Sequence, residues 1–285
     1  MKKLAILSVF TILVTYSAGV SAFPWESLKD CTSSKLTVPQ KNRALKLMGD
    51  ISNYHGCPQS IKKCVEKGKN QTALFAGGMI CRMILDGAGD ARIKKAVEER
   101  GKSLHPFKAN KFNHRSALCT GTISTNTVVI DVFSDFKCPY CRKILPMVKD
   151  LGKKRSNIVV CFRHFPTLTH GKHAITSSLA AEAAANQGKF WDYHDLLYAN
   201  HTKDSQSDYE SFAEKLGLDL SKFRKDMASR AVRKVVSADK GEGLKAQVRG
   251  TPTIFIDGKM FTMKYTLELF LSIIDEQTML RTGKK

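Results

Sequence analysis

The chain has 285 residues, enough for two modest domains, and a formal net charge of +20. Such an excess of positive charge can favour binding to anionic membrane surfaces, acidic clients or nucleic acid. The lysines of this chain are scattered, however, and no basic run is interleaved with aromatic residues. A solvated basic surface is therefore preferred over nucleic-acid binding, and no stretch after residue 22 is long and apolar enough to cross a membrane.

The first 22 residues have the pattern of an export signal. Lys2 and Lys3 give a basic start, an apolar stretch runs from Leu4 to Val20, and small residues precede a cleavage position after Ala22. A permanent membrane anchor is the disfavoured alternative, because no basic stop-transfer flank follows. We therefore predict a cleaved signal peptide, with the mature protein in the periplasm or secreted.

All eight cysteines lie in the part that we expect to be exported. An even number of cysteines in an oxidising compartment indicates disulfides. Cys57, Cys64 and Cys81 are expected to contribute to structural bridges, because they crowd one short helical region. Cys119 and Cys161 can bridge each other, with a buried free thiol at Cys161 as the rival interpretation. The sequence does not resolve the pairing.

Residues 23–115 are expected to form a helical, disulfide-containing region. Apolar residues recur at helical spacing from Asn42 to Asn53, a second apolar stretch runs from Ala73 to Leu85, and a third helix, Ala91 to Glu99, follows a glycine-containing turn. The segment from Lys102 to Arg115 has the polar composition of a linker. We expect this region to serve in packing or in forming a homodimer, with a client-binding module as the alternative.

The pattern changes where the β-branched and aromatic run from Val128 to Phe133 predicts a buried strand. A short segment leads to Cys138, and we expect a helix from there to about Leu151. A second strand is expected over residues 157–165. The order of strand, helix and strand indicates a right-handed crossover and a parallel pair of strands.

Helical spacing returns between about residues 172 and 247. The expected helices are Ala174–Asn186, Phe190–Ala199, Tyr209–Leu216 and Met227–Val248. The Asp-Gly dipeptide at 257–258 then separates two β-rich runs, Thr253–Ile256 and Met260–Met263, which is a strong hairpin pattern. An amphipathic helix from Leu267 to Glu276 is expected near the end.

Cys138 and Cys141 form a Cys-Pro-Tyr-Cys motif directly after the predicted strand, at the start of a predicted helix. Free backbone N–H groups and the helix dipole stabilise a thiolate at that end, and can bring a thiol pKa from about 8.5 to roughly 3.5–7.5. Cys141, about one turn later, can attack a mixed disulfide on Cys138 and release the client. A zinc site or an inert bridge is a weaker alternative, because the motif occurs once and would close a very short loop.

The residues from Phe133 to Cys141, and those from Gly250 to Thr253, resemble the motifs of the thioredoxin superfamily. The helical block between them is similar to the DsbA-like branch, whose helical domain is inserted within the thioredoxin fold. The resemblance covers roughly residues 128–277. It implies an α/β fold: a DsbA-like thioredoxin domain at 116–285 with a helical insert at about 172–247, preceded by the helical region described above.

The resemblance also implies the roles of four residues. Cys138 would be the substrate-linked cysteine and Cys141 the resolving one. Pro252 would follow a cis peptide bond and pack against the disulfide. The backbone at Thr251 would pair with an extended client segment, a mode of binding that tolerates many side chains.

Three further residues are weighed against the family pattern. Pro139 and Tyr140 shape the motif, and Tyr140 stands where the best-known DsbA oxidases have a histidine, which leaves the direction of electron flow open. Asp131 lies near the position of the buried acid that assists proton transfer in thioredoxins. An offset of one residue in the spacing keeps Asp131 outside the predicted site.

The sequence thus predicts an exported protein disulfide oxidoreductase, with an oxidase preferred over an isomerase or reductase because of the DsbA-like insert. It would act on exported cysteine-containing proteins, with no cofactor, metal or nucleic acid. The resemblance implies a membrane partner that resets the pair, DsbB-like for an oxidase or DsbD-like for an isomerase. The alternative is a holdase or assembly factor for cysteine-containing exported clients.

Overall fold

The computed structural model describes residues 20, 22–68, 70–105 and 109–282. Nearly all of the predicted signal peptide therefore lies outside the described residues. The chain divides into two compact units: the first comprises the residues up to His105 together with 262–264 and those from Glu268 onward, and the second comprises the remainder. Among the described residues, no helix has the length and apolar character needed to cross a membrane.

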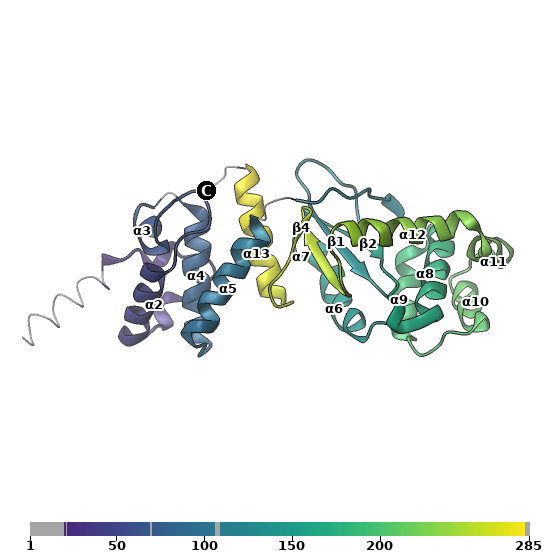
Figure 1. Cartoon of the computed structure of the whole chain (residues 1–285), viewed down its shortest axis with the longest axis horizontal. Coiled ribbons are helices and arrows are strands. Elements are labelled where there is room, and N and C mark those ends of the chain that lie inside the picture. Colours follow the sequence, from purple (N-terminus) through teal and green to yellow (C-terminus); the bar gives the residue numbers. More distant parts are fainter. Residues whose placement is uncertain (1–19, 21, 69, 106–108, 283–285) are drawn as a thin grey trace, which may run out of the picture. The chain divides into compact units, whose positions relative to one another are not determined.

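The first unit is helical, and α4 lies among its other helices (Figure 1). Its elements are η1 (Trp25–Ser27), η2 (Ser33–Lys35), α2 (Val38–Asp50), α3 (Ile61–Glu66), α4 (Gln71–Leu85), α5 (Asp90–Leu104) and nearly all of α13 (Leu267–Thr282). Gly78 of α4 allows close packing against the chain at Lys29, because a Cβ at this position would lie 1.6 Å from the carbonyl oxygen of Lys29. The predicted linker from Lys102 is helical in its first three residues. The domain boundary near residue 115 stays a prediction.

Two disulfides and one buried ion pair hold the first unit together. The disulfides join Cys31 to Cys81 and Cys57 to Cys64. Arg100 of α5 donates to the Glu276 carboxylate of α13 at 2.6 Å, and both side chains are fully buried. The Tyr54 hydroxyl donates to the same carboxylate at 3.0 Å. The charge of Arg100 is therefore neutralised inside the unit.

The second unit contains a four-stranded sheet in the order β2-β1-β3-β4. Its strands are β1 (Val128–Ser134), β2 (Ile158–His164), β3 (Thr253–Ile256) and β4 (Lys259–Met260). The connection between β1 and β2 contains α6 (Pro139–Lys149) and α7 (Leu151–Lys154), and these two strands are parallel, as predicted. The predicted hairpin is also confirmed, because Asp257 and Gly258 both have positive φ between the antiparallel β3 and β4. β4 is shorter than expected, since Thr262 hydrogen-bonds to Ser103 instead of continuing the ladder.

Helices inserted between β2 and β3 gather beside the sheet (Figure 1). They are η4 (Leu168–His170), α8 (Gly171–Ala185), α9 (Phe190–Ala199), α10 (Gln206–Lys215), α11 (Leu220–Ala228) and α12 (Arg230–Lys245). The predicted helix from Met227 was wrong at its start. Ser229 ends α11 and caps α12, with its hydroxyl accepting the backbone N–H of Val232.

All seven residues of β1 are buried, so both faces of the sheet are covered. Successive side chains of a strand point to opposite faces. One face carries Ser134 and Phe162, and Phe162 packs against Phe190 of α9 at a ring separation of 5.3 Å. The other face carries Asp131 and Phe133, and Phe133 belongs to a core cluster with residues just beyond α12.

A third disulfide joins Cys119, ahead of β1, to Cys161 of β2. The rival interpretation, a free thiol at Cys161, is therefore wrong. With this bridge all six cysteines outside the Cys-Pro-Tyr-Cys motif are paired, and Cys138 and Cys141 are free thiols.

Candidate active site

Cys138 is the N-cap residue of α6, and Pro139 begins the helix. The loop that follows β1 turns back on itself, because the backbone N–H of Cys138 donates to the carbonyl oxygen of Asp135 at 3.0 Å. Cys138 is 5% exposed, and Cys141, one turn further along α6, is fully buried. Cys138 thus lines the surface groove described below, and Cys141 is buried behind the surface.

The surroundings of the two sulfurs give them opposite acidities. A hydrogen bond from Cys141 makes the largest contribution in lowering the pKa of Cys138 to about 5. Burial opposes this shift, while Thr251 and the backbone N–H groups of Cys141 and Tyr140 add to it. Burial and the neighbouring Cys138 raise the pKa of Cys141. At neutral pH the geometry therefore favours a thiolate on Cys138 and a thiol on Cys141.

A loop before β3 lies against the first sulfur. The Thr251–Pro252 peptide bond is cis, and the carbonyl oxygen of Thr251 is 3.3 Å from the Sγ of Cys138. The hydroxyl of Tyr265 donates to the Pro252 carbonyl at 3.2 Å. The structure thus brings Thr251 next to Cys138, while Tyr140 points outward with 72% of its surface exposed.

A groove of about 590 Å³ lies beside Cys138. Two leucines on its wall are unusually exposed, Leu168 at 87% and Leu244 at 50%. Lys240 and Arg249 also line it, so the groove combines apolar and basic surface. An extended chain with apolar and acidic side chains would match it.

The buried carboxylate of Asp135 fixes the loop that carries Cys138 to one wall of the groove. One oxygen accepts the backbone N–H of Lys137 at 2.8 Å. The other accepts the backbone N–H and the hydroxyl of Thr167, and lies 2.8 Å from Nδ1 of His170. Sequence reasoning missed this link; the signal was an acidic residue three positions before Cys138 in the family-like motif.

Asp131 and Ser134 lie on the same strand but face different sides of the sheet. Asp131 lies on the sheet face opposite to Ser134, and its carboxylate is 2.9 Å from Nε2 of His114. The hydroxyl of Ser134 instead lies 2.8 Å from the Tyr198 hydroxyl, and Ser134 acts to lower the pKa of Cys141. The Ser134 hydroxyl is therefore on the side of the sheet that faces α6 and α9.

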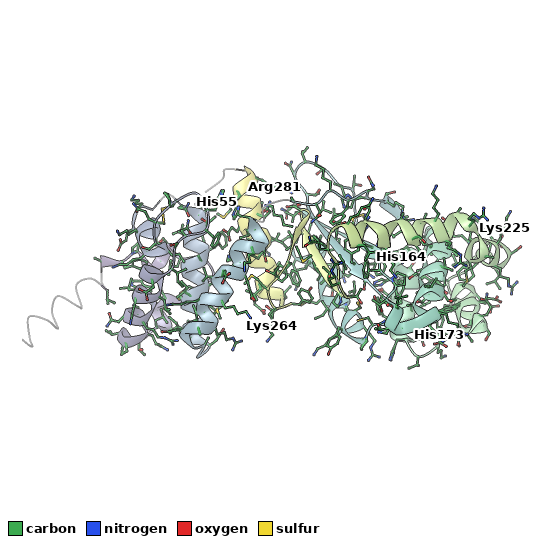
Figure 2. The ribbon with its side chains drawn as sticks, viewed as in Figure 1. His55, His164, His173, Lys225, Lys264 and Arg281 are labelled. Atoms are coloured by element: carbon green, nitrogen blue, oxygen red, sulfur yellow. A yellow bond between two sulfur atoms is a disulfide. The ribbon has the colours of Figure 1, made fainter. Side chains whose placement is uncertain are left out.

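Buried charge elsewhere in the second unit is engaged in packing. His164 lies in its interior (Figure 2), with Nε2 2.7 Å from the Glu182 carboxylate, to which Arg115 also donates. Burial opposes ionisation of Glu182, but the bonds from Arg115 and His164 lower its pKa to about 2. No three His, Cys, Asp or Glu side chains in the described part of the chain are grouped to hold a metal ion.

Comparison with known proteins places these features in context. The family model described as thioredoxin matches residues 121–276. The Na⁺/H⁺ antiporter NhaA 1 of Salinispora arenicola is 36% identical over 141 residues, which are 50% of this chain and 22% of the antiporter. A probable disulfide bond formation protein D of Bacillus cereus is 31% identical over 144 residues, which are 45% of this chain and 64% of that protein. The chain therefore spans about a fifth of the first relative and less than two thirds of the second.

Among solved structures, BdbD from Bacillus subtilis in its oxidised form has a TM-score of 0.52 and 18% identity. The match covers 60% of this chain and 97% of that one. At this identity the likeness concerns the fold alone. Together with the family match, it confirms the predicted class, an α/β thioredoxin fold with inserted helices and a helical region ahead of it.

Proposed function

Because the chain belongs to the thioredoxin family, we propose that it is an exported thiol–disulfide oxidoreductase in which Cys138 and Cys141 alternate between a disulfide and two thiols. The observation that carries the proposal is the placement of two free thiols one turn apart at the start of α6, with the carbonyl oxygen of Thr251, before the cis Pro252, 3.3 Å from the Sγ of Cys138. A low pKa makes Cys138 a good leaving group, and a high pKa keeps Cys141 protonated once it is reduced. A structural disulfide that never exchanges does not need this difference in pKa between its two sulfurs.

In the oxidising direction, a client thiolate attacks the Sγ of Cys138. The bond between Cys138 and Cys141 breaks, its electron pair goes to Cys141, and Cys141 takes up a proton. A second client thiolate then attacks the client sulfur of the mixed disulfide, and Cys138 leaves as a thiolate. The client gains one disulfide, and the enzyme pair accepts the two electrons.

Stabilisation of the Cys138 thiolate supports an oxidase in preference to an isomerase or reductase. Whatever stabilises the reduced form of a dithiol pair makes the corresponding disulfide a stronger oxidant. A membrane protein would then reset the pair, a DsbB-like quinone-linked oxidase for this direction and a DsbD-like reductase for the other.

The groove beside Cys138 supports exported proteins in an extended conformation as clients. Backbone pairing at Thr251 would hold a client segment regardless of its sequence, and the cis Pro252 follows directly. Leu168 and Leu244 offer apolar contacts beside the sulfur, and Tyr140 adds an exposed aromatic ring. Pro139 fits the first turn of α6, where its missing N–H group is no loss.

The disulfides support location in an oxidising compartment, the periplasm or the exterior. Three bridges pair six cysteines within the described residues, a number that reducing compartments rarely allow. This agrees with the predicted signal peptide. For residues 23–115 we propose packing or homodimer formation, since two bridges close within this region and a buried ion pair joins its Arg100 to Glu276 of α13.

Turnover of reduced, unfolded ribonuclease A in glutathione buffer tests the proposal. We expect the wild-type chain to restore ribonuclease activity and the Cys138→Ser variant not to do so. A Cys57→Ser, Cys64→Ser double variant, which loses a bridge of the first unit, is the matched control and should keep the activity. Client maturation at the wild-type rate by Cys138→Ser would instead favour the holdase.

The direction of electron flow needs an equilibrium measurement. We expect the pair, equilibrated with glutathione, to be more oxidising than thioredoxin at about −270 mV. A potential at or below that value would reverse the assignment and make the protein a reductant.

A further inference from the structure

The buried position of Cys141 raises a problem that the proposed function does not solve. Whenever the reduced enzyme releases a client, Cys141 must attack Cys138 as a thiolate. Cys141 is fully buried, and burial raises its pKa. The carboxylate of Asp131 lies on the other face of the sheet, and that of Asp135 accepts hydrogen bonds from Lys137 and Thr167.

Ser134 is the polar side chain that β1 presents to this sulfur. It is the last residue of the strand and is fully buried. Its hydroxyl acts to lower the pKa of Cys141, as a donor to the thiolate does, and the backbone of Asp135 acts in the same direction. A hydroxyl has a single proton to donate, so its value to the thiolate depends on where that proton points.

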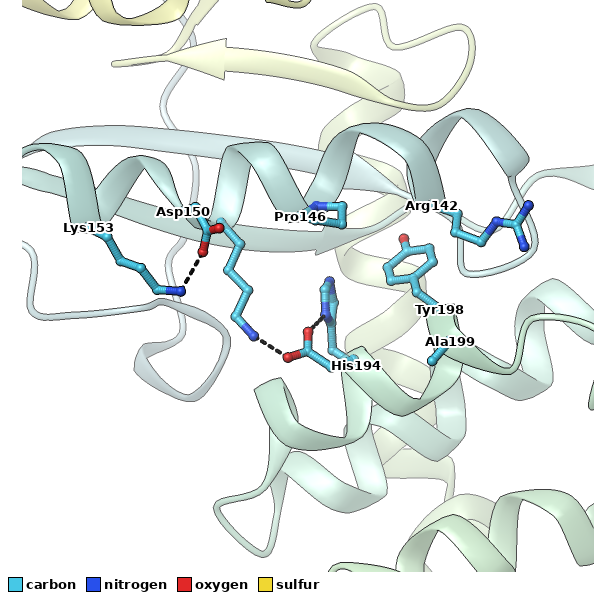
Figure 3. Close-up of a pocket in the computed structure, with 9 residues that line it drawn as sticks. Arg142, Pro146, Asp150, Lys153, His194, Tyr198 and Ala199 are labelled. Atoms are coloured by element: carbon cyan, nitrogen blue, oxygen red, sulfur yellow. Dashed lines mark hydrogen bonds and ion pairs between the residues drawn. The ribbon is translucent and has the colours of Figure 1, made fainter. Parts of the chain in front are cut away.

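Tyr198 determines the direction of that proton. Figure 3 shows Tyr198 projecting from α9 toward α6, beside Pro146 and Arg142. Its hydroxyl lies 2.8 Å from the Oγ of Ser134 and 3.5 Å from the carbonyl oxygen of Asp135. Burial raises the pKa of Tyr198 well above its ordinary value, so the phenol keeps its proton and remains a donor.

We propose that Ser134 is a catalytic residue that donates a hydrogen bond to the Cys141 thiolate, and that Tyr198 is a positioning residue that donates to Ser134. When Cys141 is a thiol, the Tyr198 hydroxyl can turn to the Asp135 carbonyl while Ser134 accepts from Cys141. When Cys141 ionises, both hydroxyls rotate so that each donates toward the sulfur. This inference rests on the proposed function, because it concerns the resolving step of the same pair.

The step that the pair of hydroxyls assists is balanced. Cys141 gives its proton to water and attacks the Sγ of Cys138 in the mixed disulfide. The new bond joins the two enzyme sulfurs, the bond from Cys138 to the client sulfur breaks, and the client leaves with the electron pair. The departing client thiolate takes up a proton from water, so no net charge remains.

Stopped-flow reaction of the reduced chain with excess 5,5′-dithiobis(2-nitrobenzoate) tests the proposal. The first release of thionitrobenzoate, proportional to reagent concentration, reports attack by Cys138; the second, independent of concentration, reports attack by Cys141. For Ser134→Ala we expect the second rate to fall roughly tenfold or more, as for loss of a hydrogen bond to a charged group. Its pH midpoint should rise by about one unit or more for the same reason, and the first rate should be unchanged.

Tyr198→Phe should slow the second phase by roughly fivefold, the effect of one net hydrogen bond. The matched control is Tyr193→Phe on the same helix, which deletes a buried hydroxyl bonded to the Tyr209 carbonyl. Ser134→Thr should recover most of the second rate. If Ser134→Ala and Tyr198→Phe leave the second rate within twofold of wild type, the inference is wrong while the redox pair stands. If the wild-type chain has no second phase, both this inference and the proposed function fail.

Discussion

The acidity of Cys138 yields the most direct prediction, which concerns alkylation of the reduced chain as a function of pH. Only the thiolate reacts, so the rate should follow ionisation with a midpoint at about pH 5. The pKa of Cys138 is lowered relative to an ordinary thiol. The rate is therefore expected to fall about tenfold per pH unit below pH 5 and to be flat from about pH 6 to 8.5, where an ordinary thiol is still rising.

The expected magnitude follows from two opposing effects. At pH 6 a thiol with a pKa of about 5 is about nine tenths ionised, whereas an ordinary cysteine with a pKa near 8.5 is only about 0.3% ionised. This ratio, about 300, is reduced roughly 40-fold because a less basic thiolate is a weaker nucleophile. Cys138 should therefore react roughly eightfold faster than an ordinary cysteine at pH 6.

Iodoacetamide labelling, with the modified cysteine identified by mass spectrometry, measures this rate. Cys141→Ala removes the largest contribution to the low pKa and should move the midpoint upward by at least about one unit. Cys141→Ser keeps a donor and should move it less. The oxidised chain, in which Cys138 is blocked, is the control. A midpoint near pH 8 in the wild-type chain would refute the reasoning, because the N-terminus of α6 would then stabilise no thiolate.

Three predictions concern stability. Replacing Cys119 and Cys161 together by alanine should lower the free energy of unfolding by about 4 kcal/mol, since their bridge closes a loop of 42 residues; urea unfolding measures it. Glu276→Gln should cost about 3–5 kcal/mol, because it leaves the charge of Arg100 buried without its partner; thermal unfolding at pH 7 measures it. Gly78→Ala should cost about 1–3 kcal/mol, because its Cβ would overlap a backbone oxygen 1.6 Å away; hydrogen exchange of α4 measures it.

Each of these predictions has a matched comparison. The bridge between Cys57 and Cys64 spans only 7 residues, so its removal should cost less, about 2 kcal/mol. Gly49 of α2 has open space around it, and Gly49→Ala should be neutral or stabilising by up to about 1 kcal/mol. Equal losses from the two bridges, or from the two glycines, would contradict the loop-length and overlap arguments. An unchanged melting temperature for Glu276→Gln would mean that groups other than Glu276 neutralise the buried charge of Arg100.

The parts of the fold that the sequence predicts well are those with local signals. The run at Val128–Phe133 and the dipeptide at 257–258 specify a strand and a turn through a few adjacent residues, and both are present. The break between α11 and α12 also had a local signal, the capping serine Ser229, which the continuous apolar spacing concealed. The bridge between Cys31 and Cys81 had none, because the partners are 50 residues apart and meet only after the helices pack.

The candidate site likewise has residues that a local sequence signal predicts and residues that it does not. Cys138 and Cys141 follow from the motif and its place after a strand. Ser134 and Asp131 were not distinguishable, because β1 is buried on both faces and its sequence lacks the alternation that marks an inward and an outward side. Which residue faces Cys141 depends on the register of β1 under α6, and the register is set by β2 and β3.

That register explains why the two sulfurs have different sources of stabilisation. Cys138 is at the end of a helix, where the backbone N–H groups of Tyr140 and Cys141 add to the larger effect of the Cys141 side chain in stabilising a thiolate. Cys141 is one turn inside, where the backbone N–H groups of the helix are already used, so its pKa is lowered instead by Ser134 at the end of β1 and by the backbone of Asp135 just after it. A slip of one residue in β1 would replace Ser134 by Phe133 or Asp135 at this point, and so offer either an apolar ring or a second negative charge to the sulfur. The environment of Cys141 is therefore a consequence of strand register, and that of Cys138 is a consequence of helix position together with the neighbouring Cys141.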